Sequence, residues 1–340
     1  MNILIYSTKS AYAFSKIGGA ESSLQLIAEK LADNGNKVVF ITGKGNWRLK
    51  YKPVVFKKVQ VYFFPNFIDR LILIIFNKFL SSYQFIVFKK RLKRLLKETI
   101  LREKIDIVYT YYELDILKLF ISVQRETKSF ALVMRMAGLF WHEQIKKNSL
   151  LKAEYEQVFN SVDSINYISA GLLKLVNSLC EDSGVNLNNK RYFTGDIGVD
   201  SFEAQKMWKG PKLDDKLVIL VATRFSVHQK RQDLIVDAMA FLKNDDRIKL
   251  IMVGDGPNRS KIEQRIIHHG LEEIVSVIPF IPQKELWELM QNVDILGHPC
   301  DYEGLSKIII ESMMMGLPVL GSNVLPLSDY IEDGVNGYLS

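Results

Sequence analysis

Residues 301–311 read Asp-Tyr-Glu-Gly-Leu-Ser-Lys-Ile-Ile-Ile-Glu, and this stretch guides the interpretation of the whole chain. The apolar segment before it, residues 294–298, predicts a short strand. The apolar run after Ser306 predicts a helix that continues to Met315 and ends at the Gly-Leu-Pro of residues 316–318. A strand, a loop and a helix in this order form the repeating unit of a doubly wound α/β sheet.

Two carboxylates of this stretch, Glu303 in the loop and Glu311 in the helix, lie on either side of the predicted helix start. The eight helical residues that separate them rise about 12 Å. The helix N-terminus, with the free N–H groups of Leu305 and Ser306, attracts phosphate. The arrangement has the length of a nucleotide diphosphate sugar, with Glu303 at the sugar and Glu311 at the ribose. A helix with one capping acid and one solvated acid is the alternative that these residues leave open.

The length and composition indicate a cytoplasmic globular protein. The chain has 340 residues, enough for two domains or one large one, and 48% of them are hydrophobic, enough for buried cores. Cys180 and Cys300 lie far apart and have no metal-ligand spacing, which fits a reducing compartment. The chain starts directly with a strand-like segment, so we expect no signal peptide.

Strand-like segments alternate with helical periodicity along the chain, which predicts parallel sheets covered by helices on both faces. The segments predicted as strands are residues 2–7, 37–42, 59–64, 106–111, 130–134, 164–169, 217–222, 248–253, 274–278, 294–297 and 318–321. A polar linker at 201–216 divides an N-terminal domain, 1–200, from a C-terminal domain, 217–340. The predicted fold class is α/β, with two Rossmann-like doubly wound domains that face each other across a cleft.

The net charge of +7 is distributed unevenly. Residues 1–200 carry 30 Lys and Arg against 18 Asp and Glu, a net +12, whereas residues 201–340 carry 15 against 20, a net −5. Residues 67–104 combine dense apolar positions with the cations Lys89, Lys90, Arg91, Lys93, Arg94 and Lys97. Such a segment can lie on an anionic membrane surface, although a core helix followed by a solvated basic helix is the alternative. Charges interrupt the apolar run too often for a membrane span, and no motif for reading nucleic acid accompanies the cations.

Two further motifs follow predicted strands of the C-terminal domain. Arg224 and Lys230 come after residues 217–222, where paired cations can neutralise the charge that grows on a leaving diphosphate. The turn at residues 253–257, Val-Gly-Asp-Gly-Pro, lets a ligand approach the backbone closely. The chain contains neither a Gly-x-Gly-x-x-Gly fingerprint nor a Walker A motif, which argues against a dinucleotide dehydrogenase and a P-loop enzyme.

Taken in order, these motifs resemble glycosyltransferase family 4, whose members have the GT-B fold. The resemblance rests on the cations Arg224 and Lys230 and on the pair Glu303 and Glu311, which have seven residues between them. Four glycine-containing motifs complete it, at residues 18–21, 254–257, 316–319 and 332–337. It covers nearly the whole C-terminal domain and part of the N-terminal one.

The resemblance implies a retaining transfer of a sugar from a nucleotide diphosphate sugar. Glu303 would contact the transferred sugar, while Arg224 and Lys230 would hold the β-phosphate. The residues implied to bind the donor are Gly18, Gly19, Gly254, Phe280, Gly304, Leu305, Ser306 and Glu311. Neither a metal nor another cofactor is implied. We expect the acceptor to be a glycolipid or a surface polysaccharide, and the protein to be peripheral on the inner face of the cytoplasmic membrane.

The chain departs from the family pattern in three places. Lys230 follows Arg224 by six positions where five is usual, so Lys230 can sit differently. A strand that often ends in histidine ends here near Arg135, and Arg135 and His142 are candidates for acceptor or sugar contacts. The chain stops at Ser340, where the family continues with further helices, so we expect a truncated C-terminal end. A sugar-nucleotide epimerase or phosphorylase and a non-catalytic sugar-nucleotide-binding or assembly subunit remain as alternative functions.

Overall fold

The computed structural model of the chain contains two compact units. One comprises Met1–Ile168 and Val176–Gly198, and the other comprises Ser169–Leu175 and Val199–Ser340. The structure describes residues 1–10, 12–13, 19–44, 53–65, 78–187, 191–195, 198–199, 216–225, 229–304 and 306–340, with only the backbone at 44, 65 and 78–88. The predicted linker, residues 201–216, lies outside the described residues except for its last position, so the predicted domain boundaries remain predictions.

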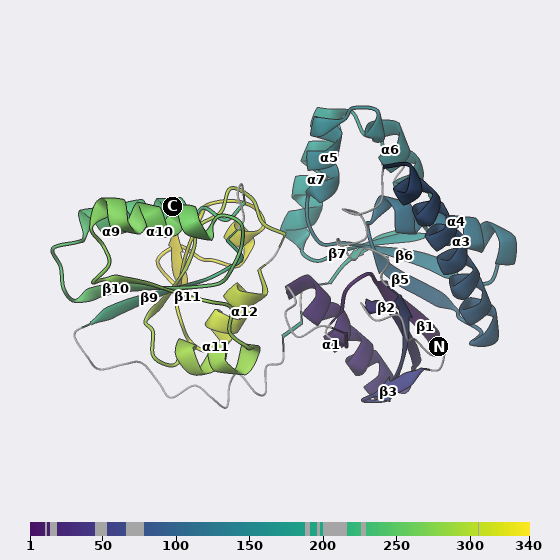
Figure 1. Cartoon of the computed structure of the whole chain (residues 1–340), viewed down its shortest axis with the longest axis horizontal. Coiled ribbons are helices and arrows are strands. Elements are labelled where there is room, and N and C mark those ends of the chain that lie inside the picture. Colours follow the sequence, from purple (N-terminus) through teal and green to yellow (C-terminus); the bar gives the residue numbers. More distant parts are fainter. Residues whose placement is uncertain are drawn as a thin grey trace. The chain divides into compact units, whose positions relative to one another are not determined.

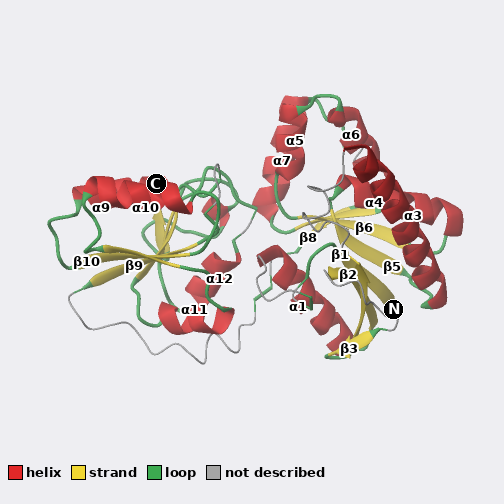
Figure 2. Ribbon diagram, viewed as in Figure 1, coloured by secondary structure: helices red, strands yellow, loops and turns green. Residues whose placement is uncertain are grey.

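The first unit is built on an eight-stranded sheet of order β3-β4-β2-β1-β5-β6-β7-β8 (Figures 1 and 2). Its strands are β1 Asn2–Ser7, β2 Lys37–Lys44, β3 Val54–Phe56, β4 Val59–Pro65, β5 Ile107–Tyr111, β6 Ala131–Met136, β7 Ser164–Tyr167 and β8 Tyr192–Thr194. Every neighbouring pair is parallel except β3, which runs antiparallel to β4. The strand order reverses at β1, with β2 on one side and β5 on the other, which is the topological switch point of a doubly wound sheet.

Helices cover this first sheet. They are α1 Gly19–Asp33, α3 Lys78–Arg102, α4 Leu114–Thr127, α5 Phe140–Lys147, α6 Leu151–Ser161 and α7 Ala170–Ser183, the last of which is divided between the two units. Leu24 and Ala28 of α1 pack against Ile5 and Phe40 of the strands, as their helical spacing predicts. Among the described residues, no helix combines the length and the apolar character that a membrane crossing requires.

The second unit contains a fully parallel six-stranded sheet of order β11-β10-β9-β12-β13-β14 (Figure 2). Its strands are β9 Leu217–Ala222, β10 Ile248–Val253, β11 Val275–Ile278, β12 Ile295–His298, β13 Val319–Gly321 and β14 Gly337–Leu339. Its helices are α9 Gln232–Phe241, α10 Arg259–His269, α11 Gln283–Met290, α12 Lys307–Met314 and the 3₁₀ turn η1 Leu327–Asp329. Figure 1 shows α9 and α10 on one face of the sheet and α11 and α12 on the other.

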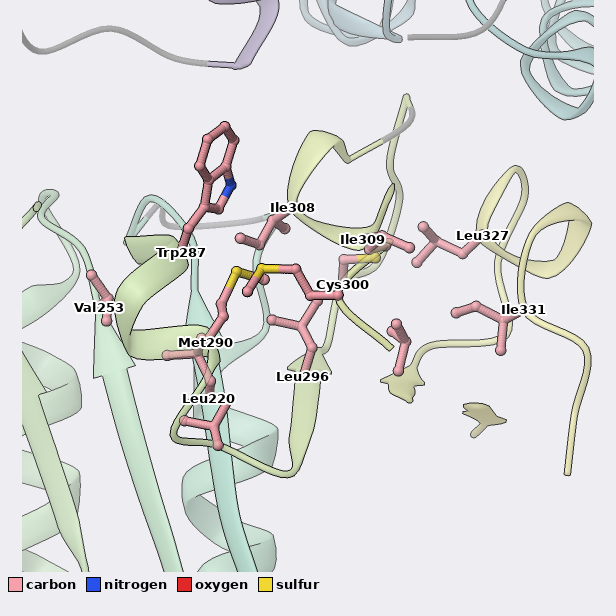
Figure 3. Packing of buried hydrophobic residues seen from close by; sticks show 13 residues of the cluster. Leu220, Val253, Trp287, Met290, Leu296, Cys300, Ile308, Ile309, Leu327 and Ile331 are labelled. Atoms are coloured by element: carbon pink, nitrogen blue, oxygen red, sulfur yellow. The ribbon is translucent and has the colours of Figure 1, made fainter. Parts of the chain in front are cut away.

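The alternation of side chains along β9 explains this layering. Ile219 and Val221 belong to the core cluster under α9 and α10. Leu220, between them, belongs instead to the cluster under α11 and α12, where it packs with Met290 and Ile309 (Figure 3). Successive strand side chains point to opposite faces, so a continuous apolar run such as that of β9 fills two cores at once.

The structure confirms the predicted fold class and extends it. Each predicted strand corresponds to an observed strand within about two residues, and the predicted helix of residues 306–315 is observed as α12. The three strands that were not predicted are β3, β8 and β14, which have three residues each and lie at sheet edges. β3 and β8 are exposed along their whole length, so no alternation of apolar and polar side chains marks them in the sequence.

Candidate functional site

Three predicted motifs meet at the carboxyl edge of the second sheet. The loops that carry them follow β9, β10 and β12, which are neighbours in the sheet. The Phe225 N–H donates to the Asp255 carbonyl oxygen at 3.1 Å, joining the first two loops, and the Asp301 N–H donates to the Gln229 carbonyl oxygen at 3.0 Å, joining the first and third. Ligands of parallel sheets bind at this edge, so the arrangement is that of a binding site.

Glycine allows the closest of these contacts. Gly254 has a φ of 150°, and a Cβ added there would lie 2.1 Å from the Thr223 carbonyl oxygen. Gly256 has a φ of 157°, and its added Cβ would lie 2.3 Å from the Phe225 carbonyl oxygen. Only glycine fits these two positions, because any side chain would collide with the backbone of the neighbouring loop.

A buried cluster of three polar side chains forms where the first and third loops join. The Lys230 Nζ contacts the Glu303 Oε2 in a very short ion pair. The His298 Nε2 lies 3.1 Å from the same Glu303 oxygen and 3.2 Å from the Lys230 Nζ. The other oxygen of Glu303, Oε1, accepts the Gly304 N–H at 3.0 Å. The side chains of Lys230 and Glu303 are 12% and 11% exposed and that of His298 is fully buried, so water screens their charges weakly.

Burial shifts the proton equilibria of this cluster. Burial lowers the pKa of Lys230 to about 8, and the guanidinium of Arg224 acts in the same direction. Burial also lowers the pKa of His298 well below its ordinary value, with help from the Lys230 charge, so the imidazole is neutral at pH 7. The cluster therefore presents one cation, one carboxylate and one neutral donor or acceptor.

Arg224 is brought to the same loop but is not part of the buried cluster. Its side chain is exposed and forms no ion pair with any residue that the structure describes. Its carbonyl oxygen accepts a hydrogen bond from the Nε2 of the buried Gln232 at 2.9 Å, and that amide also donates to the Thr223 Oγ1 at 2.9 Å. Gln232 thus fixes the loop and leaves the Arg224 guanidinium available to an anion.

The predicted phosphate-binding helix start is present. Ser306 is the N-cap of α12, and the first N–H groups of the helix have no partner within it. Gly304 is buried beside Glu303, and Leu305 lies outside the described residues. The arrangement therefore places a helix N-terminus a few residues beyond Glu303, as expected.

Glu311 lies on α12 in a different environment from the one expected. Its carboxylate is 2% exposed, pairs with the Lys307 Nζ at 3.2 Å, and accepts a hydrogen bond from the Gln283 Nε2 at 3.0 Å. Burial raises its pKa, although Lys307 and Gln283 oppose that shift. The alternative of a solvated acid is therefore wrong, because this carboxylate is buried, although its Oε1 has no hydrogen bond beside the ion pair with Lys307.

The remaining donor-site candidates divide between the two units. Phe280 is 38% exposed, and its N–H donates to the Asp255 Oδ2 at 3.1 Å, which ties the loop after β11 to the glycine turn. In the first unit, Gly19 begins α1, while Gly18 lies outside the described residues.

Arg135 and His142 occupy buried positions in the first unit. Arg135 on β6 is 2% exposed, and its guanidinium donates to the Tyr109 hydroxyl at 2.9 Å and the Ser23 hydroxyl at 3.0 Å. Ser23 belongs to α1, so Arg135 connects that helix to the sheet. His142, at the start of α5, is 7% exposed, and burial lowers its pKa. Neither residue is shown to be a ligand contact.

Sequence reasoning missed four polar residues of this edge, namely Gln232, Gln283, His298 and Lys307. His298 carries a usable signal, because a polar residue at the last position of a buried parallel strand points to a site. Gln232, Gln283 and Lys307 lie in the first turns of helices or next to them, a position that ordinary surface residues also occupy. Among the described residues, no group of three or more His, Cys, Asp or Glu side chains has the geometry of a metal site.

Comparison with known proteins gives a family match in the second unit. Residues 202–340, which include all three loops, match the family model described as glycosyl transferases group 1. This match covers less than half of the chain. The resemblance to glycosyltransferases is thus confirmed, whereas the narrower assignment to family 4 stays a prediction.

The curated relatives are distant glycosyltransferases. The chain is 29% identical to alpha-D-kanosaminyltransferase of Streptomyces kanamyceticus over 37% of its length and 32% of the relative's. It is 23% identical to N-acetyl-alpha-D-glucosaminyl L-malate synthase of Bacillus anthracis over 96% of its own length and 81% of the relative's. It is 24% identical to alpha-monoglucosyldiacylglycerol synthase of Acholeplasma laidlawii over 46% of its own length and 38% of the relative's. The chain therefore spans about a third of the length of two of these three relatives.

Solved structures agree on the fold. Sucrose-phosphate synthase from Thermosynechococcus elongatus has a TM-score of 0.77 at 16% identity, over 99% of this chain and 85% of that one. HepE from Anabaena, solved in complex with UDP-glucose, has a TM-score of 0.71 at 18% identity, over 100% of this chain and 85% of that one. At such identities these likenesses establish the fold alone, which is the GT-B arrangement of two doubly wound units.

Proposed function

We propose that the protein transfers a sugar from a nucleotide diphosphate sugar to an acceptor hydroxyl, with retention of the anomeric configuration. The observation that carries this proposal is the meeting of Lys230, Glu303 and the start of α12 at one edge of the second sheet, within the residues that match the group 1 family model. A cation, a carboxylate and a helix N-terminus are the groups that a diphosphate and a sugar hydroxyl require.

Each residue receives a role from its surroundings. Lys230 and the exposed Arg224 bind the β-phosphate, assisted by the first N–H groups of α12. Glu303 accepts hydrogen bonds from hydroxyls of the transferred sugar. Glu311 binds the ribose once it exchanges the Gln283 or Lys307 contact for a hydroxyl. Phe280, half-exposed beside the glycine turn, lies against the base.

The chemistry follows from these roles. The bond between the anomeric carbon and the diphosphate oxygen breaks, a bond from that carbon to the acceptor oxygen forms, and the acceptor hydroxyl passes its proton to the oxygen of the leaving diphosphate. Negative charge grows on the diphosphate as it leaves, and Lys230, Arg224 and the helix N-terminus stabilise that charge. The proposal assigns this stabilisation to groups of the protein and includes no metal ion or other cofactor.

A glycolipid or surface polysaccharide is the proposed acceptor, at the inner face of the cytoplasmic membrane. One relative is named alpha-monoglucosyldiacylglycerol synthase, which supports a lipid acceptor. The net +12 of residues 1–200 fits an anionic surface. Residues 67–77 of the predicted membrane segment lie outside the described residues, and residues 78–102 form α3.

The test is a panel of UDP, GDP and ADP sugars, incubated with the full chain in excess EDTA and screened first by thermal shift. We expect one donor to raise the melting temperature and to release its nucleoside diphosphate when a glycolipid extract is added. The anomeric configuration of the product, read by NMR, should match that of the donor. Binding without any release or transfer would favour the non-catalytic subunit, and activity that needs added magnesium would contradict the metal-independent mechanism.

A further inference from the structure

His298 is the one member of the buried cluster to which neither the sequence nor the proposed mechanism assigned a role. It is the last residue of β12, and its imidazole is fully buried. Its Nε2 lies within hydrogen-bond distance of both the Lys230 Nζ and the Glu303 Oε2, at 3.2 and 3.1 Å. Its Nδ1 has no hydrogen-bond partner among the described residues. The ring therefore interacts with its surroundings through a single nitrogen.

The surroundings decide which nitrogen carries the proton of the neutral ring. A proton on Nδ1 would leave a buried N–H without an acceptor, and buried N–H groups without partners are rare in proteins. A proton on Nε2 points at the Glu303 carboxylate, which is an acceptor only. The geometry thus favours a Nε2–H that donates to the Glu303 Oε2.

We infer that His298 is a positioning residue that holds the Glu303 carboxylate in place and keeps it hydrogen-bonded when Lys230 turns from Glu303 to the donor's diphosphate. This inference rests on the proposed function. In the ligand-free protein, the Glu303 Oε2 has two partners, Lys230 and His298, and Oε1 has the Gly304 N–H. If Lys230 moves to a phosphate, His298 is the remaining partner of Oε2.

The free-energy cost of moving Lys230 explains why Glu303 needs a second hydrogen-bond donor. A carboxylate that is 11% exposed and has lost the cation that pairs with it is unfavourable unless other hydrogen bonds hold it. Without His298, Lys230 would stay with Glu303 and bind the phosphate less readily. A hydrogen bond to a charged group is worth about a 10- to 100-fold change in an equilibrium constant, so removing it should weaken diphosphate binding by about that factor.

Two substitutions of His298 test whether its hydrogen-bond donor or only its volume is needed. His298→Gln keeps an N–H near the position of Nε2, whereas His298→Leu fills similar space without a donor. His268→Leu makes the same change at an exposed histidine of α10 and serves as the control. UDP, GDP and ADP, and the matching monophosphates, are titrated into the full chain by calorimetry at pH 7, and melting temperatures are recorded without ligand.

The ratio of diphosphate to monophosphate affinity is the readout, because a loss of general stability would weaken both ligands alike. We expect His298→Leu to reduce this ratio about 10- to 100-fold, and His298→Gln and His268→Leu to stay within about threefold of the wild type. An unchanged ratio in His298→Leu would overturn the inference and leave the proposed function standing. If the wild type binds no nucleoside diphosphate, the proposed function fails and the inference fails with it.

The tautomer can be measured without any ligand, which keeps this arm independent of the proposed function. The chain has five histidines, so ¹⁵N spectra of histidine-labelled protein are simple, and His298→Gln assigns the signal of interest. We expect a neutral ring with its proton on Nε2 near pH 7. A ring protonated on Nδ1 would mean that Nε2 accepts from Lys230, and it would overturn the inference even if His298→Leu weakens binding.

Discussion

At the scale of single residues, the buried ion pair of Lys230 and Glu303 is the feature on which the account depends. Neither residue is isolated, because the backbone contacts between the loops after β9 and β12 determine their positions. Replacing one partner leaves the other charged group without its counter-ion in a site that water screens weakly. Tests at this site therefore use substitutions that preserve shape.

The first prediction concerns the pH dependence of diphosphate binding. Lys230 is a cation below its pKa of about 8 and loses its charge as the pH rises through that value. The affinity for a nucleoside diphosphate should therefore be constant near pH 7 and fall above pH 8. Lys230→Arg is the control, because a guanidinium stays charged and should remove this dependence. Calorimetry between pH 6.5 and 9.5 checks it, and the same decline in both proteins would show that another group is responsible.

The second prediction separates the two glutamates. Glu311→Gln should weaken donor binding at least severalfold, because a ribose contact acts equally in the ground and transition states. Glu303→Gln should leave donor affinity within a few-fold of the wild type and lower kcat by about 100-fold or more, because its contacts to the reacting sugar strengthen in the transition state. Calorimetry and turnover at saturating donor decide between these outcomes. Equal losses of affinity in both variants, with turnover intact, would refute the assignment.

At the scale of elements, the order of the strands brings the three loops to one sheet edge, and contacts between the loops then fix the geometry of the site. The glycine turn after β10 lies so close to the loop after β9 that the added Cβ distances are far below van der Waals contact. The first turn of α9 supports the same loop through Gln232. A substitution that moves one loop should therefore also displace the loops packed against it.

Gly254→Ala tests this coupling. Its methyl group would collide with the Thr223 carbonyl oxygen, so the loop must move. We expect a fall of several degrees in the melting temperature and a loss of diphosphate binding. Gly270→Ala is the matched control, since Gly270 has a φ of 64° but nothing within 4 Å of its added Cβ, and only the backbone cost of about 1 kcal/mol applies. Equal effects of the two substitutions would mean that the contact with Thr223 carries no weight.

The fourth prediction concerns α3, whose cations are not equivalent. Lys89 pairs with Asp115 at 2.7 Å, and Lys93 and Lys97 pair with Glu126 of α4 at 2.6 and 2.7 Å, so these cations are partly neutralised. Lys90 and Arg91 are exposed and form no ion pair with a described residue. If α3 attaches to membranes, these two residues should contribute most, at about 1 kcal/mol each.

Charge reversal at Lys90 and Arg91 should release the protein from anionic liposomes in a sedimentation assay. Reversal at Lys261 and Lys284, which are exposed in the second unit, changes the net charge equally and should have no effect. Salt should weaken the wild-type binding, because exposed charges are screened within about 10 Å. A wild-type chain that ignores anionic liposomes at low salt would remove the membrane from the proposal.

At the scale of the whole molecule, the sequence predicted the layers well and the site in part. Long apolar runs such as β9 predict buried parallel strands. The order of the motifs predicted the resemblance to glycosyltransferases, which the family match of residues 202–340 supports. The burial of Glu311 and the contacts of His298 could not be predicted, because they depend on which side chains of separate helices and strands meet in space. The periodicity of apolar residues shows which face of a helix or strand a residue occupies, but not which side chain of another element it contacts.

The most direct measurement of the central claim is hydrogen–deuterium exchange of the full chain with and without the UDP, GDP or ADP sugar that binds. We expect protection in the loops after β9, β10 and β12 and in the first turn of α12, because the proposed function places the diphosphate and the sugar at these segments. Lys230→Met, which keeps the length of the side chain without its charge, should lose this protection at the same donor concentration. Protection confined to other segments, or protection that survives in Lys230→Met, would contradict the claim that this sheet edge is the donor site.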